Sequence, residues 1–78
     1  ELKLSLSQAL RRWRSTRKLT QTELAKRLGS SQSRVAKMEA GDPTVSADLL
    51  LRSLLALGAT PKDIASSLTT QRRKAGAT

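Results

Sequence analysis

Apolar side chains recur along the first part of the chain at intervals of three and four residues, which is the spacing of one helix face. The first such set consists of Leu6, Ala9, Leu10 and Trp13. With basic residues around the rest of the circumference, this set predicts a helix over residues 7–18. Leu2 and Leu4 alternate with polar residues as in a strand, but no later segment offers a partner strand. We therefore expect residues 1–6 to form an irregular lead-in.

Capping signals bound the later helices. A Ser or Thr at the N-cap precedes each of three predicted helices, and a glycine suited to positive φ follows each one. These three segments run from Thr20 to Gly29, from Ser31 to Gly41 and from Ser46 to Gly58. Thr60 and Pro61 open a last helix that continues through Leu68. The pattern predicts an all-α, compact five-helix domain over residues 7–68, followed by a flexible basic tail over residues 69–78.

Composition excludes most catalytic chemistry. A chain of 78 residues has room for one small core. Because it has no Cys and no His, it lacks the residues for a disulfide, a thiolate nucleophile, a Ser-His pair or a structural zinc site. Its few carboxylates fit caps, loops and an ion pair, so we expect no catalytic residue, no cofactor, no metal and no enzyme. No apolar run approaches the roughly 20 residues that a membrane span needs, and we expect a cytoplasmic protein.

The net charge of +9 at pH 7 is distributed unevenly. Most of the basic side chains lie in residues 1–41, whereas residues 42–68 are nearly neutral. A basic half joined to a neutral half is typical of a protein that meets a polyphosphate with one side, so nucleic acid is the expected partner. The alternative is that the excess of Lys and Arg only keeps a leucine-rich domain in solution.

Three residues in the window 21–40 carry a resemblance to a known family. Counted from Gln21, the small or β-branched residues Ala25, Gly29 and Val35 fall at positions five, nine and fifteen. This arrangement resembles the helix-turn-helix motif of the phage-repressor and Cro-like (XRE) family, and the resemblance extends over about residues 10–68. It implies a lambda-repressor-like fold, binding to double-stranded DNA at the bacterial nucleoid, and a role as a transcriptional regulator, most often a repressor.

The third predicted helix, residues 32–40, is the candidate for reading DNA. On a helical wheel Val35 and Met38 define a buried side, and the opposite side is polar or small. The resemblance and the wheel together assign base contacts to Gln32, Ser33, Ala36 and Lys37. Gln suits an adenine edge, Lys suits guanine acceptors, Ser suits either, and Ala allows close approach or contact with a thymine methyl. The alternative is a polar helix face that only meets solvent.

Phosphate contacts are expected from the first turn of the helix that begins after Thr20. Free backbone amides and the helix dipole favour an anion there, and by family analogy Gln21 adds a side-chain donor. Arg34 lies on the flank of the third predicted helix, where it reaches either a phosphate or solvent. The remaining arginines and lysines cannot be placed from the sequence.

The resemblance gives Arg14 and Glu39 a structural role. In the phage repressors that this sequence resembles, an Arg and a Glu at the matching positions form a largely buried salt bridge. Glu39 also lies at the boundary of the buried helix face, where an unpaired carboxylate is costly. We therefore expect a structural ion pair and not a catalytic acid.

The fourth predicted helix, which follows Ser46, has more leucine than a small core can hide, so part of it is expected to meet a second chain. In the family this contact involves the end of that helix and the helix after it, which makes Leu57, Ile64 and Leu68 candidates for a homodimer interface. The alternative is that all of these side chains belong to the core. Two further functions stay open, namely an antitoxin that binds a toxin protein and its own operator, and a nucleic-acid bridging module without sequence preference.

Overall fold

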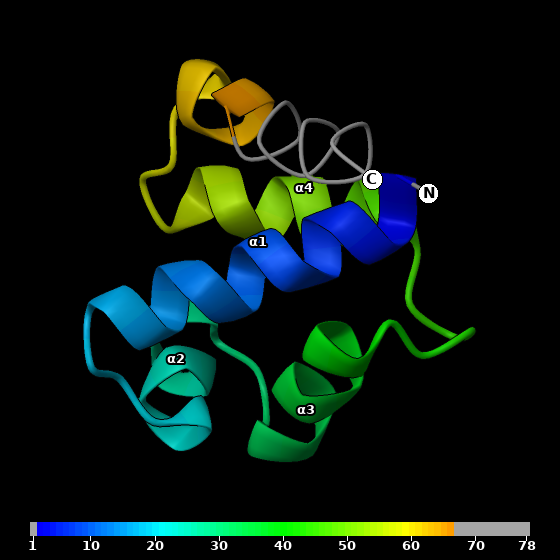
Figure 1. The fold of residues 1–78 in the computed structure, drawn as a ribbon. Helices are drawn as coiled ribbons and strands as arrows, with labels where there is room; N and C mark the ends of the chain where they lie inside the picture. Colours follow the sequence, from blue (N-terminus) through cyan, green and yellow to red (C-terminus); the bar gives the residue numbers. More distant parts are fainter. Residues whose placement is uncertain (1, 67–78) are drawn as a thin grey trace, which may run out of the picture.

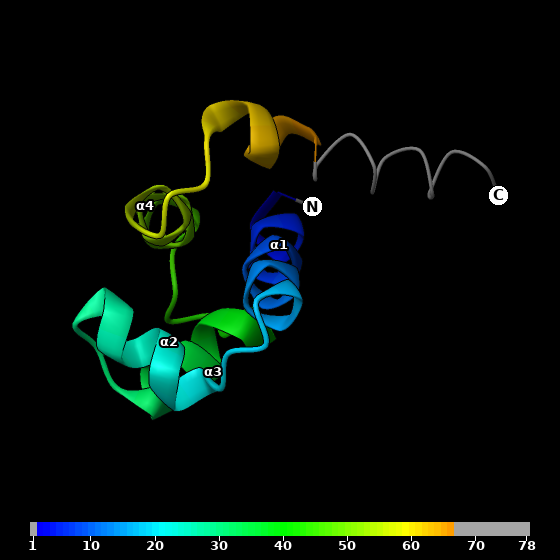
Figure 2. The same cartoon turned by 90° about the vertical axis from the view of Figure 1, so that its left-hand side faces the viewer.

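A computed structural model describes residues 2–66 as a bundle of short helices. The helices are α1 (Leu2–Thr16), α2 (Gln21–Leu28), α3 (Gln32–Ala40) and α4 (Ala47–Ala56), followed by a helical segment over residues 61–66. No strand occurs among the described residues, so the prediction of an all-α domain with five helices is confirmed. Figures 1 and 2 show α2 and α3 on one side of α1, with residues 61–66 on the opposite side. None of the described helices is long and apolar enough to cross a membrane.

The predicted N-caps form as the sequence indicated. The Thr20 hydroxyl accepts a hydrogen bond from the Glu23 amide (3.1 Å), and the Glu23 carboxylate accepts one from the Thr20 amide (2.8 Å). These bonds lower the pKa of Glu23. Ser31 and Ser46 cap α3 and α4 through their hydroxyl oxygens. Because each cap satisfies a backbone donor that the helix leaves free, the caps fix where α2, α3 and α4 begin.

Helix α1 corrects two sequence predictions. It begins at Leu2, so the irregular lead-in expected over residues 1–6 is wrong for its described part, and it ends at Thr16 instead of residue 18. Leu6 fits both a strand-like alternation and a helical stripe. Its burial in the core favours the helix. The Lys3 ammonium also donates to the Asp42 carbonyl (2.6 Å), which holds the first turn of α1 against the loop after α3.

The end of α1 has a left-handed residue that is not glycine. Lys18 has a φ of 55°, and the amide of the next residue, Leu19, donates to the Arg14 carbonyl (3.2 Å). Gly29 and Gly41 occupy the same place after α2 and α3, with φ of 65° and 68°. Left-handed backbone is unfavourable for side chains with a Cβ, so the turn after α1 carries a strain that the turns after α2 and α3 avoid.

One apolar core joins the helices. Its buried members are Leu6, Ala9, Leu10, Leu24, Ala25, Val35, Met38, Val45, Leu50, Leu54, Ala59 and Ile64. The residues from α1, α2 and α3 match the predicted apolar faces, and Trp13 packs against this core while half-buried. On α4 the two deepest leucines are buried, whereas Leu51 and Leu55 are 39% and 44% exposed. Helix α4 therefore faces the core with one stripe and solvent with another.

Candidate nucleic-acid interface

Helices α2 and α3 form a rigid pair around a short turn. Gly29 ends α2 in the left-handed conformation, and the Ser30 amide donates back to the Ala25 carbonyl (2.8 Å). Ala25 in α2 is buried, and Val35 in α3 is completely buried in the same core. The small side chain lets the two helices approach closely, so the turn and the seam together fix how α3 projects from the domain.

The outward face of α3 carries the four residues predicted to contact bases. Gln32, Ser33 and Lys37 are exposed, and Ala36 is half-buried. The opposite side of α3 holds Val35 and Met38 in the core, as the wheel predicted. Figure 1 shows α3 on the outside of the bundle, away from residues 61–66. This face offers a neutral amide, a hydroxyl, a methyl group and an ammonium, which are side chains that suit base edges in the major groove.

Arg14 and Glu39 form the salt bridge that the resemblance implied. The Arg14 Nε donates to Glu39 Oε2 (2.6 Å), and a second guanidinium nitrogen donates to Glu39 Oε1 (3.0 Å). Another nitrogen of the same guanidinium donates to the Leu19 carbonyl (2.8 Å). The side chains are 18% and 5% exposed, and the hydrogen bonds to Glu39 raise the pKa of Arg14. This bidentate salt bridge connects α1 to the end of α3, and the third bond of the guanidinium connects α1 to the turn before α2.

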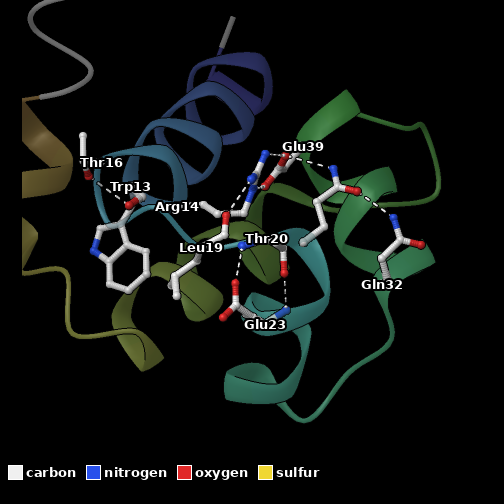
Figure 3. Close-up of polar contacts among 9 residues, drawn as sticks. Trp13, Arg14, Thr16, Leu19, Thr20, Glu23, Gln32 and Glu39 are labelled. Atoms are coloured by element: carbon white, nitrogen blue, oxygen red, sulfur yellow. Dashed lines mark hydrogen bonds and ion pairs between the residues drawn. The ribbon is translucent and has the colours of Figure 1, made fainter.

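A chain of hydrogen bonds leads from this salt bridge to the outward face of α3 (Figure 3). The Gln21 Nε2 donates to Glu39 Oε1 (3.1 Å), and the Gln32 Nε2 donates to Gln21 Oε1 (2.6 Å). Sequence reasoning named Gln21 and Gln32 separately and missed that they contact each other. Two glutamines at the first positions of successive helices were the available signal, but only the packing of α2 on α3 brings them together. The network holds the half-buried side chain of Gln21 and the exposed side chain of Gln32 in place.

Two recesses border α3 and add basic side chains to its surroundings. One, of about 300 Å³, is lined by Arg34 and Lys37 together with Thr44 from the loop before α4. The other, of about 280 Å³, is lined by Arg11 beside Ala36. The sequence could not place Arg11 relative to α3, and it gave no reason to select Thr44. The structure brings both next to the outward face, so each is an additional candidate for contact with a phosphate.

The structure places the predicted dimer residues mostly inside the single chain. Ile64 is buried in the core, and Leu57 packs against the core while half-buried. Leu68 lies outside the described residues, as does the tail predicted over residues 69–78. The large apolar side chains that α4 exposes are Leu51 and Leu55. No group of three or more metal-ligating side chains occurs in the described part of the chain.

These features define a class of protein. A short exposed polar helix, held by a tight turn against a preceding capped helix in an all-helical domain, is the arrangement of helix-turn-helix DNA-binding domains. The chain matches the family model described as a helix-turn-helix domain over residues 5–67, and it belongs to that family. No curated protein and no solved structure matches the chain.

Proposed function

We propose that this protein is a sequence-specific transcriptional regulator of the phage-repressor type, which binds double-stranded DNA in the bacterial nucleoid and represses transcription. The observation that carries the proposal is the Gln32 side chain on the exposed face of α3, held by Gln21 and through it by Glu39. A side chain fixed before binding loses less conformational freedom on binding, which favours specific recognition over general attraction to phosphate.

The hydrogen bonds that Gln32 keeps free suit adenine. An amide group has two N–H donors and one carbonyl acceptor, and Gln32 gives one N–H to Gln21. Its second N–H and its carbonyl oxygen can then bond the N7 and N6 positions of an adenine in the major groove. Lys37, one turn further along α3, supports a contact with guanine, and Ser33 and Ala36 complete the reading face.

Phosphate contacts hold α3 in the groove in this proposal. The first turn of α2 supplies free backbone amides, and Gln21 has a second N–H that it does not give to Glu39. Arg34 is exposed on the flank of α3 and supplies a charged donor. The net charge of +9 adds a long-range attraction that falls as salt is added.

We propose that the regulator binds as a homodimer with twofold symmetry. Two copies of α3 would then lie about one turn of DNA apart, on a palindromic site. The exposed leucines of α4, Leu51 and Leu55, support a contact near the end of this helix. Leu57 and Ile64 would contribute at the edge of this contact, since most of their surface packs within the chain.

Selection of bound sequences from a randomised duplex pool at about 0.15 M salt tests the proposal, because non-specific phosphate binding is weak under these conditions. We expect a palindrome whose half-sites are about 10 base pairs apart. Lys37→Gln should change the preferred base at one position of each half-site. Lys62→Gln removes the same charge from the opposite side of the domain and should leave the selected sequence unchanged. Recovery of no sequence above background would overturn the proposal.

The exposed leucines also favour a second candidate function, an antitoxin whose α4 surface is covered by a toxin protein instead of a second copy. Both functions include binding to an operator, so DNA selection does not separate them. Co-expression of this protein with the product of the neighbouring gene separates the two functions. A stable one-to-one complex with the neighbouring gene product would support the antitoxin function. If the protein purifies without that product, the repressor function is supported.

A further inference from the structure

A cavity of about 160 Å³ lies between α1, α4 and residues 61–66. Figures 1 and 2 show these segments on the side of the domain away from α3. Its apolar lining comes from Ala9, Leu54, Ala59 and Ile64, with Trp13 beside them. This cavity opens to solvent, and its volume is similar to that of an enclosed apolar cavity of about 150 Å³ that accepts a benzene molecule. Size and lining therefore fit a ligand with one six-membered ring.

Trp13, which lines this cavity, has an indole donor without a hydrogen-bond partner among the described residues. The indole Nε1 is buried and makes no hydrogen bond within residues 2–66. Figure 3 shows the indole turned away from the network of Arg14 and Glu39, with only the backbone carbonyl of Trp13 bound, by the Thr16 hydroxyl (2.9 Å). A buried N–H without a partner is unfavourable. Because this atom is inaccessible, it serves as a reporter for the cavity that Trp13 lines and not as a contact for a ligand.

Two arginines give the cavity a positive side. The Arg17 guanidinium carbon lies 3.8 Å from the centroid of the Trp13 ring, and Arg12 also borders the cavity. Neither forms a salt bridge with any other described residue. A guanidinium stacked on an aromatic ring keeps its N–H groups free at its edge, in a geometry that matches a carboxylate.

The lining contains one acid, Asp63, which offsets part of this charge: its pKa is lowered chiefly by hydrogen bonds from Thr60 and also by the charge of Arg17. Its carboxylate accepts a hydrogen bond from the Thr60 amide (3.0 Å) and completes the cap of the helical segment over residues 61–66. Two cationic side chains and one capped carboxylate leave a net positive rim beside an apolar wall. This combination favours a ligand that is apolar at one end and anionic at the other.

We propose that this cavity binds a small aromatic carboxylate of one ring. The ring lies against Leu54 and Ile64, and the carboxylate bonds Arg12 and Arg17 at the rim. The site goes beyond the proposed DNA contacts, because it lies on the side of the domain away from the reading face of α3. Ligand binding can therefore be measured on the free protein, independently of any operator.

The single tryptophan of the chain gives a direct readout. In the ¹⁵N-labelled full chain, the indole N–H of Trp13 produces one resonance, which we would follow while adding sodium benzoate. We expect a saturable shift of this resonance. Benzyl alcohol keeps the ring and lacks the charge, so it should bind about tenfold more weakly, since hydrogen bonds to charged groups are the stronger ones. Sodium acetate, which lacks the ring, should give no saturable shift.

A pair of neighbouring variants provides the matched control. Arg12→Glu reverses a charge at the rim and should raise the dissociation constant for benzoate about tenfold or more. Arg11→Glu makes the same change at an exposed arginine that borders the recess beside Ala36, and it should alter the constant by less than about twofold. The proposal is overturned by the absence of a saturable benzoate shift, by equal affinity for benzyl alcohol, or by equal weakening in both variants.

Discussion

Ser7 combines complete burial with an unsatisfied hydroxyl. Its side chain is inaccessible, and its Oγ has no hydrogen-bond partner in the described part of the chain. Ser53, the other buried polar residue among residues 2–66, donates its hydroxyl to the Leu49 carbonyl (2.8 Å). The hydroxyl of Ser7 therefore destabilises the folded chain, because it is buried without a partner, whereas the hydroxyl of Ser53 is satisfied.

Replacing Ser7 by alanine should stabilise the domain. We expect Ser7→Ala to raise the free energy of unfolding by about 1 kcal/mol, because it removes an orphan donor and improves helix propensity. Ser53→Ala gains the same propensity but loses a hydrogen bond, so its effect should be near zero or destabilising. Urea denaturation of the two variants measures the difference. A gain for Ser53→Ala as large as that for Ser7→Ala would contradict this account of Ser7.

The left-handed residue after α1 offers a second stabilising change. Lys18 has a φ of 55°, a conformation that glycine adopts without strain. We expect Lys18→Gly to raise the free energy of unfolding by about 1 kcal/mol. Lys18→Ala removes the same charge and keeps the strain, so it serves as the control and should give no such gain. The reverse change, Gly29→Ala, should cost a similar amount, since nothing lies near the added methyl group and only the backbone is strained.

At the scale of elements, the Arg14–Glu39 pair connects α1 to α3. Removing one member of a nearly buried pair leaves the other charge without its partner, which is more costly than removing both. We expect Arg14→Met to lower the free energy of unfolding by about 2 to 3 kcal/mol, given the partial exposure of Arg14. The double variant Arg14→Met with Glu39→Leu should lose less. If the loss in the double variant equalled the sum of the losses in Arg14→Met and in Glu39→Leu, the two residues would act independently, which would contradict the pairing.

Local signals were enough to predict most of the elements. The starts of α2, α3 and α4 follow from Thr20, Ser31 and Ser46, because a cap is decided by residues within one turn of it. The start of α1 could not be decided this way, since alternating leucines at the N-terminus fit two periodicities. The end of α1 was also predicted wrongly, because the left-handed residue after it is Lys18 and not the glycine that usually marks a helix end.

The site was predicted in its parts but not in its connections. The helical wheel identified the outward face of α3, and the structure leaves Gln32, Ser33 and Lys37 exposed there. The bond between Gln21 and Gln32 joins two helices across a turn, so it depends on packing that periodicity does not encode. The cavity beside Trp13 is equally hidden from the sequence, because its walls come from three separate segments.

At the scale of the whole molecule, the domain has the outward polar face of α3 and an apolar strip on α4 made of Leu51 and Leu55. Leu51 and Leu55 are 39% and 44% exposed and lie one turn apart on the same helix, so they offer an apolar surface that a second chain can cover. In the proposed homodimer, these side chains would lie between two copies. Their exposure in the single chain also means that polar replacements leave the core intact.

Polar substitutions on this strip should separate dimerisation from folding. We expect the double variant Leu51→Ser with Leu55→Ser to fold with nearly unchanged stability and to bind a palindromic operator at least about tenfold more weakly, because two half-sites would no longer be held together. Sedimentation and operator titration measure the two effects. Leu54→Ser, at a position only 2% exposed, should instead unfold the domain. An unchanged operator affinity in the double variant would place the dimer contact elsewhere.

The bond between Gln21 and Gln32 also limits how this domain could be retargeted to a new DNA sequence. Ser33 and Lys37 are exposed, so they are exchangeable surface positions. Residue 32 differs, because its amide supports Gln21 and, through Gln21, borders the salt bridge under α3. A grafted side chain that cannot donate to Gln21 would alter the support of the neighbouring helix together with the base preference. Successful exchange at position 32 should therefore require a compensating exchange at position 21.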